Sequence, residues 1–179
     1  DNVVIFGAGS IGICALMAAK ASRARVIQVE PLPKRQEFAQ KIGADHIIDP
    51  SKEDVEAKVM EYTGGVGGNV VIEASGNDKA IASIFDVAAH SARVRLIGHS
   101  IGRKVPVEIG KTIWKTLLIT GSGGVRSFLP RTITFMDRIR DEFDFTDLIS
   151  HRYPFEKLQE ALDKATEDKA NAFKVMINF

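Results

Sequence analysis

Short apolar runs alternate with longer segments of helical periodicity over the first 120 residues. The runs, rich in β-branched side chains and typical of strands buried on both faces, fall at residues 3–6, 25–29, 46–48, 70–73, 92–97 and 117–120. Helical spacing of apolar residues occupies 10–21, 33–42, 51–62 and 78–89. Strands alternating with helices at this spacing predict right-handed βαβ units and an α/β fold, a doubly wound parallel sheet.

Residues with known end preferences place several of the helix boundaries. Pro33 suits the first turn of the second helix, and Gly43 is suited to ending it. Ser51 can cap the third helix, with Asp54 at the reciprocal position of a capping box, although that position prefers Glu or Gln. We therefore expect the third helix to begin directly after Ser51.

The regular alternation of short strands and helices ends at the glycine-rich stretch at 121–124. Beyond it the pattern predicts a helix at 128–143, a strand at 148–153, a helix at 156–166 and a strand at 173–179. This stretch is too small to bury a core of its own. We therefore expect two parts, a domain over residues 1–124 and a small C-terminal α/β segment over residues 125–179.

The composition excludes several classes of protein. The chain of 179 residues is 45% hydrophobic and 26% charged, which is ordinary for a globular protein. A net charge of +1 argues against a nucleic-acid or membrane-surface role driven by bulk charge. No apolar run approaches the roughly 20 residues of a membrane helix, and the first residues read as a core strand rather than a signal peptide. Because the chain opens directly on such a strand, we expect a fragment cut at a domain boundary.

Cysteine usage adds one constraint. Cys14 is the single cysteine, which rules out an internal disulfide and a cysteine-rich zinc site within this chain. Its place in the first predicted helix suggests a small core residue. A reducing, cytoplasmic location is consistent with this composition.

Three glycines between the first strand and the first helix carry the clearest chemical signal. Gly7, Gly9 and Gly12 fit the pattern G-x-G-x-x-G. In that pattern the first glycine permits a tight turn, the second admits a pyrophosphate, and the third lets the helix pack closely on the strand. The helix N-terminus then offers free N–H groups to the anion. The sequence therefore predicts a dinucleotide site at this turn.

An acidic residue at the end of the second strand indicates which dinucleotide. Glu30 can accept hydrogen bonds from the adenosine ribose hydroxyls and would repel a 2′-phosphate, so the sequence favours NAD over NADP. Lys34 and Arg35 lie just beyond and are suited to binding a phosphate, which leaves NADP as the alternative.

Two other motifs are incomplete. The stretch ending in Lys111 resembles the end of a phosphate-binding P-loop, but Val105 stands where that loop needs glycine. Tyr153 and Lys157 have the spacing of a short-chain dehydrogenase pair, but Pro154 falls where the catalytic helix should run. The four histidines show no spacing typical of metal ligands.

Taken together, the motifs resemble the C-terminal part of the medium-chain dehydrogenase/reductase superfamily, in its zinc-type alcohol and polyol dehydrogenase branch. The resemblance extends over the whole chain. It rests on VVIFGAGSIG at 3–12, Glu30, KIGADHIIDP at 41–50, GGNVVIEASGN at 67–77, ARVRLIG at 92–98, LISHRYPFEKLQEALDKA at 148–165 and AFKVMINF at 172–179. It implies a Rossmann fold for residues 1–124 and a return segment, residues 125–179, that completes a catalytic domain missing from this chain.

The resemblance also implies a set of cofactor contacts around the glycine turn. Backbone N–H groups of the first helical turn would meet the pyrophosphate, and residues at later strand ends would meet the adenine and the nicotinamide. The candidate cofactor-binding residues are Gly7, Gly9, Ser10, Ile11, Gly12, Glu30, Arg35, Ser75, Ile97, Gly98, His99, Gly121, Ser122 and Lys174. Asn77 follows the same strand as Ser75, and for Ser75, Asn77 and His99 a role as ordinary loop residues is equally consistent with the sequence. For Lys174 a role as a solvated strand residue is equally consistent.

The function implied is hydride transfer from an alcohol, a secondary alcohol or polyol, to NAD. Zinc is expected only in the missing catalytic domain, so the resemblance implies no catalytic residue or metal ligand here, and the fragment alone is expected to be inactive. In dimeric members the strand near 115–120 pairs with its symmetry mate, so a homodimer or tetramer is expected. Two alternatives remain: a zinc-free, NADPH-dependent quinone or enoyl reductase of the same superfamily, and a non-enzymatic dinucleotide-sensing domain.

Overall fold

The structure, a computed structural model, describes residues 1–98, 101–123 and 128–179. Its main sheet has six parallel strands in the order β3-β2-β1-β4-β5-β6. The strands are β1 (Asn2–Phe6), β2 (Arg25–Val29), β3 (His46–Ile48), β4 (Gly68–Glu73), β5 (Ala88–Leu96) and β6 (Leu118–Gly121). The predicted doubly wound parallel sheet is confirmed, since the strand order reverses direction between β1 and β4.

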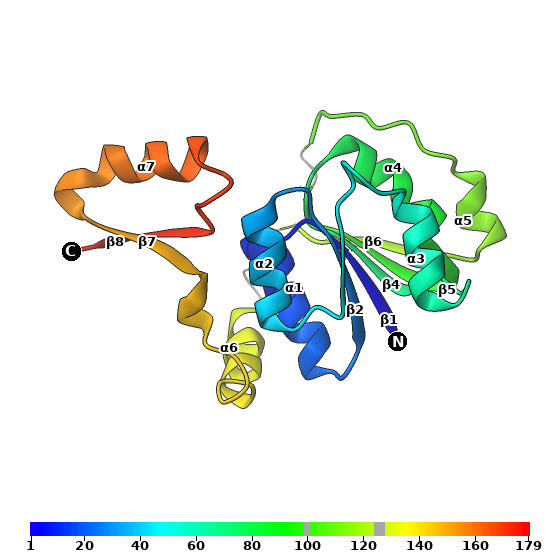
Figure 1. Ribbon diagram of the computed structural model, residues 1–179, viewed down its shortest axis with the longest axis horizontal. Helices are drawn as coiled ribbons and strands as arrows, with labels where there is room; N and C mark the ends of the chain where they lie inside the picture. The colour runs from blue at the N-terminus through cyan, green and yellow to red at the C-terminus, as the bar shows by residue number, and fades with distance from the viewer. Residues whose placement is uncertain (99–100, 124–127) are drawn as a thin grey trace.

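Helices cover both faces of this sheet (Figure 1). On one face, α1 (Ser10–Ala21) and α2 (Pro33–Ile42) pack on Val3 and Ile5 of β1. On the other, α3 (Val55–Thr63) and α4 (Asp78–Val87) pack on Val4 and Phe6. Successive β1 side chains therefore enter opposite cores, because side chains along a strand alternate between the two faces of the sheet.

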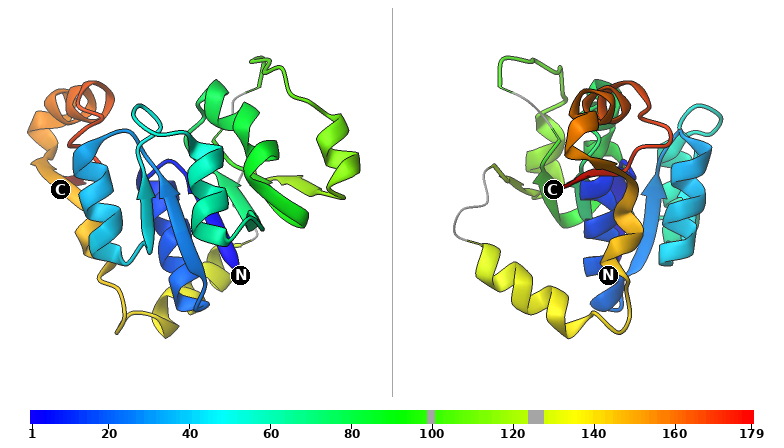
Figure 2. Two further views of the ribbon diagram at one scale, coloured as in Figure 1. Left: turned by 45° about the vertical axis from the view of Figure 1, so that its right-hand side comes forward. Right: turned by 90° about the vertical axis from the view of Figure 1, so that its left-hand side faces the viewer.

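The chain beyond the sheet forms a smaller unit beside α1 and α2 (Figure 2). It comprises α6 (Leu129–Arg138), the 3₁₀ helices η1 (Phe145–Leu148) and η2 (Phe155–Lys157), α7 (Leu158–Glu167), and the strands β7 (Ile149–Pro154) and β8 (Lys174–Asn178). The two strands pair in parallel as a second sheet. Leu148, Phe145 and Phe173 pack into the apolar cluster of α1 and α2, so this unit shares part of the main core.

Three local expectations were wrong. Helix α3 begins at Val55, because Asp54 caps it by accepting a hydrogen bond from Ala57 N (3.0 Å), whereas the Ser51 hydroxyl donates to Asp49 Oδ1 (2.5 Å). Helix α6 ends at Arg138 rather than near residue 143. Cys14 is exposed rather than a core residue.

The structure also contains a short helix that the periodicity missed, α5 (Gly110–Trp114), before β6. Across the described residues, no helix combines the length and apolar character needed to cross a membrane.

Candidate functional site

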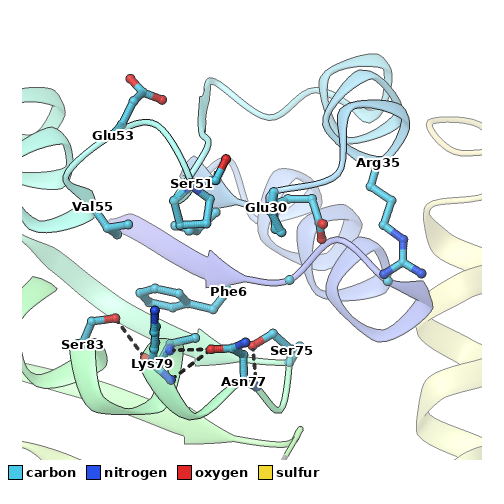
Figure 3. A pocket seen from close by; sticks show the side chains of 17 residues that line it. Phe6, Glu30, Arg35, Ser51, Glu53, Val55, Ser75, Asn77, Lys79 and Ser83 are labelled. Atoms are coloured by element: carbon cyan, nitrogen blue, oxygen red, sulfur yellow. Dashed lines mark hydrogen bonds between the residues drawn. The ribbon is translucent and has the colours of Figure 1, made fainter. Parts of the chain in front are cut away.

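A cavity of about 700 Å³ opens at the carboxyl ends of the strands, where the strand order reverses (Figure 3). Open parallel sheets bind their ligands in this crevice, and the volume is typical of a small-molecule site. The walls combine apolar and polar side chains from both halves of the sheet. The lining residues are Phe6, Gly7, Gly9, Val29, Glu30, Pro31, Arg35, Pro50, Ser51, Glu53, Val55, Ala74, Ser75, Asn77, Lys79, Ala80 and Ser83.

The glycine turn between β1 and α1 forms one edge of the cavity. Gly7 has φ of +92°, a conformation that L side chains rarely adopt. A Cβ atom on Gly12 would lie only 1.8 Å from the Gly7 carbonyl oxygen, so helix and turn meet closer than any side chain allows. Gly9 occupies the N-cap of α1, where no side chain caps the helix. The first N–H groups of α1 are therefore left for an external acceptor.

The Glu30 carboxylate is hydrogen-bonded to the backbone of this turn. The residue is 3% exposed, and its two carboxylate oxygens accept hydrogen bonds from Ala8 N (2.7 Å) and Leu32 N (3.0 Å). A carboxylate has about four acceptor positions, so two are left for a ligand at the cavity wall. Glu30 thus fixes the backbone of the glycine turn, a role that its position in the sequence did not reveal.

Arg35 brings a positive charge to the same edge. Its guanidinium lies beside the glycine turn, since a Cβ atom on Gly9 would sit 3.4 Å from Arg35 Nη1 (Figure 3). Its Nε atom is buried and has no hydrogen-bond partner within the described residues. A buried donor without a partner is costly, which marks Arg35 as a place where a ligand acceptor would be stabilising.

The opposite edge is the turn after β4. Ser75 touches the glycine turn, since a Cβ atom on Gly7 would lie 2.9 Å from Ser75 Cα. Glu73, fully buried, fixes this turn by accepting from Ser75 N (2.8 Å), Ser75 Oγ (2.5 Å) and Gly76 N (2.9 Å) on one oxygen. Asn77 accepts from Lys79 N (2.9 Å), so its side chain serves as the N-cap of α4.

The cavity therefore brings together five of the predicted site residues: Gly7, Gly9, Glu30, Arg35 and Ser75. Ser10, Ile11 and Gly12 form the adjoining first turn of α1.

Five other predicted residues lie outside the cavity lining. Ile97 and Gly98 follow β5 and donate their N–H groups to Glu73 O (2.9 and 3.1 Å). Gly121 ends β6, Ser122 N donates to Leu96 O (2.9 Å), and Lys174 begins β8 with its side chain exposed. His99 lies outside the described residues.

The sequence analysis did not identify the part of the cavity wall that is formed by residues after β3 and by residues of α4. Ser51 and Glu53 follow β3, and Lys79 and Ser83 lie on α4. The signal was available in principle, because the carboxyl ends of parallel strands all reach one edge of the sheet.

The described residues contain no cluster of three or more His, Cys, Asp or Glu side chains that could hold a metal ion. The zinc implied by the resemblance thus has no candidate ligand set in that part of the chain.

Comparisons with known proteins assign the family. Residues 10–139 match the family model described as zinc-binding dehydrogenase. The chain is 35% identical to the L-threonine 3-dehydrogenase of Pyrococcus horikoshii, over 98% of the chain and 51% of that protein. It is 31% identical to the scyllo-inosose 3-dehydrogenase of Thermotoga maritima, over 99% of the chain and 46% of that protein. The chain therefore spans about half the length of the curated relatives it matches.

Solved structures agree on the fold. The 2R,3R-butanediol dehydrogenase of Bacillus subtilis superposes with a TM-score of 0.88 at 25% identity, over 100% of this chain and 51% of that one. A short chain alcohol dehydrogenase of Escherichia coli CFT073, complexed with NADH, gives a TM-score of 0.89 at 24% identity, over 100% and 52% of the two chains. With the matched family model and relatives, these findings show that the chain belongs to the zinc-binding dehydrogenase family.

Proposed function

We propose that this chain is the cofactor-binding part of an NAD-dependent dehydrogenase that oxidises an alcohol. The observation that carries the proposal is the cavity at the β1–β4 reversal. There an uncapped helix N-terminus, a buried carboxylate and an arginine whose Nε has no partner among the described residues converge. That combination suits a ligand with a pyrophosphate and a ribose, since it offers donors to one and acceptors to the other.

The residues of the site fit the dinucleotide part by part. The N–H groups of Ser10 and Ile11 would hold the pyrophosphate, because they lie in the uncapped first turn of α1. The free acceptor positions of Glu30 would receive the ribose hydroxyls. Val29 and Pro50 offer apolar surface for the adenine. When bound, NAD would supply the acceptor for the hydride, and the chain's own part is to hold and orient it.

The rest of the enzyme lies in a second domain. In this proposal residues 1–124 bind the cofactor and residues 125–179 complete a catalytic domain whose remainder, with its zinc, is absent from this chain. The substrate would be a secondary alcohol or polyol, supported by relatives named for threonine and scyllo-inosose. A cytoplasmic homodimer or tetramer fits this picture, with the open edge of β6 available for pairing. The chain alone would bind cofactor without turnover.

One observation favours the NADP-dependent reductase as the second candidate. Glu30 is 3% exposed, and its carboxylate already accepts hydrogen bonds from two backbone N–H groups. Arg35 and Lys79 both line the cavity. A 2′-phosphate could therefore meet positive charge with little repulsion from Glu30.

Parallel calorimetric titrations with NAD and NADP separate these candidates. We would compare the wild type, Glu30→Gln and the control Glu37→Gln, an exposed glutamate on α2. Because Glu30 also fixes the glycine turn, urea unfolding of each variant must accompany the titrations. Tighter NAD binding that Glu30→Gln reduces in the folded state, with Glu37→Gln unchanged, would support the proposal. A preference for NADP would favour the reductase, and no binding of either dinucleotide by the wild type would refute both.

A further inference from the structure

Phe173, which belongs to the C-terminal segment, contacts Arg35 of the cavity lining and Ser10 of the adjoining first turn of α1. Its carbonyl oxygen accepts a hydrogen bond from Ser10 Oγ (2.6 Å), 163 residues earlier in the chain. Its ring packs on Phe38 of α2, with centroids 4.8 Å apart and planes inclined by 56°. The guanidinium carbon of Arg35 lies 5.6 Å from the centre of the same ring. One residue thus contacts the first turn of α1 and the cationic edge of the cavity.

These contacts define where the Arg35 guanidinium lies. A cation over an aromatic face is held by the ring quadrupole, and a planar guanidinium stacks well in this way. The glycine turn lies on the other side, since a Cβ atom built on Gly9 would be 3.4 Å from Arg35 Nη1. The Arg35 guanidinium therefore lies between the Phe173 ring and Gly9, and its buried Nε has no partner among the described residues.

Phe173 is itself fixed by the segment that carries it. Its N–H donates to Ser150 Oγ (3.0 Å) on β7, so its backbone is bonded on one side to the segment and on the other to Ser10. The segment also docks on α2 through an ion pair between Lys41 and Asp147 (2.8 Å), and buries Leu148 against the α1 and α2 core. Movement of the segment would therefore move Phe173 relative to Arg35.

We propose that Phe173 is a positioning residue of the cofactor site, which couples docking of the C-terminal segment to dinucleotide binding through Arg35 and Ser10. This inference rests on the proposed function, because it concerns the same cavity. The coupling is reciprocal: if the docked segment improves dinucleotide affinity, the dinucleotide stabilises docking by the same factor. Phe173 thus joins the site from the second structural unit, to which the resemblance had assigned only Lys174.

A double-mutant cycle in the 179-residue chain tests the coupling. Phe173→Leu removes the aromatic face and keeps an apolar side chain, and Arg35→Gln removes the cation. We expect Phe173→Leu to weaken NAD binding about threefold to fivefold, the range of a partly exposed cation–π contact. We also expect Arg35→Gln to cost less in the Phe173→Leu background than in the wild type. Purely additive effects on the dissociation constant would overturn the inference.

Two further variants separate positioning from general damage to the fold. Phe155→Leu is the matched control, since Phe155 lies in the same segment and stacks on Phe179 away from the cavity lining, with centroids 5.4 Å apart. We expect it to leave NAD affinity unchanged. Ser10→Ala removes the hydroxyl that holds Phe173 but keeps the Ser10 N–H, and we expect weaker NAD binding with little change in the urea midpoint. Equal effects of Phe155→Leu and Phe173→Leu, or unchanged affinity in Ser10→Ala, would refute the positioning role.

Hydrogen exchange gives a readout that a merely structural role would not change. With saturating NAD, backbone amides of β7 and β8 should become more protected in the wild type and less so in Phe173→Leu. Identical protection in both proteins would contradict the coupling. The two proposals fail in different ways. A wild type that binds neither NAD nor NADP refutes the proposed function, whereas a wild type that binds NAD with an additive cycle refutes only this inference.

Discussion

Replacing Gly12 with alanine should damage both the fold and the cofactor site. The new Cβ atom would lie 1.8 Å from the Gly7 carbonyl oxygen and 2.8 Å from the Gly7 carbonyl carbon. Since a carbon and a carbonyl oxygen normally approach no closer than about 3.3 Å, the helix and the turn would have to separate by roughly 1.5 Å. Neither atom near the new methyl group belongs to a flexible side chain that could move aside.

The size of the effect follows from what that separation disturbs. Two hydrogen bonds stabilise the turn: Gly7 N donates to Val29 O (2.8 Å), and Ala8 N donates to the Glu30 carboxylate (2.7 Å). On the other side, α1 buries Ile13 and Leu16 completely. Overpacking costs about 1–3 kcal/mol, and losing a hydrogen bond to a charged group costs about 1.5–3 kcal/mol. We therefore expect Gly12→Ala to lower the free energy of unfolding by roughly 3–5 kcal/mol.

Urea denaturation followed by circular dichroism measures this loss, with NAD titration of the folded fraction in parallel. Gly110→Ala is the matched control, because a Cβ atom there would meet no atom of the described residues within 4 Å and the residue begins α5. It should change stability by less than about 1 kcal/mol, in the stabilising direction. If the free energy of unfolding of Gly12→Ala were within about 1 kcal/mol of the wild type and its NAD affinity were unchanged, the close approach of helix and turn would be needed neither for stability nor for cofactor binding.

Two other substitutions test local features away from the cavity centre. Thr116 adopts φ of +52° just after Lys115, the C-cap of α5, and Leu117 N donates to Thr112 O (2.9 Å) in a C-terminal capping motif. Thr116→Gly should therefore raise the free energy of unfolding by about 1 kcal/mol, and a lower urea midpoint would contradict this. The ion pair with Lys52, with added hydrogen bonds from Ser51, holds the pKa of Asp49 below its usual value. Because the folded-state pKa is depressed, its stabilisation is fully present above the unfolded pKa of about 3.9 and is lost progressively as the pH falls from there through the folded-state pKa. The wild type should thus exceed Asp49→Asn in urea midpoint near pH 6, and this advantage should shrink as the pH falls from about 4 to about 2, whereas a difference independent of pH would exclude the mechanism.

The fold could be predicted because its determinants are local. The apolar run of β1, the glycines that follow and the proline and glycine that bound α2 act within a few residues of themselves, and β1, α1 and α2 lie where they were expected. The start of α3 could not be predicted in this way. Ser51 and Asp54 are both good N-caps, and the choice depends on Asp49, which binds the Ser51 hydroxyl. The periodicity also could not predict whether Cys14 is buried or exposed, because α1 carries small alanines on several faces.

The candidate site could be predicted only in part, for the same physical reason. The turn glycines and Glu30 belong to one βα unit, so their sequence spacing is enough to bring them together. The contact of Phe173 with Arg35 joins residues far apart in the chain and depends on how one unit docks on another, which no local pattern encodes. The hydrogen bonds that tie Glu30 to Ala8 and Leu32 depend on side-chain orientation, which the sequence leaves open.

The position of β1 beside β4 has a consequence for how the molecule folds. In the six-stranded sheet of the described residues, every other pairing joins consecutive strands, whereas β1 meets β4 across a separation of 67 residues, seen in the bond from Asn2 N to Asn69 Oδ1 (2.8 Å). Non-local pairings of this kind form slowly, because the chain must close a long loop first. The cavity draws one wall from residues after β1 and the other from residues after β4, so it exists only once that closure is complete. A ligand of this cavity should therefore slow unfolding while leaving the rate of folding almost unchanged.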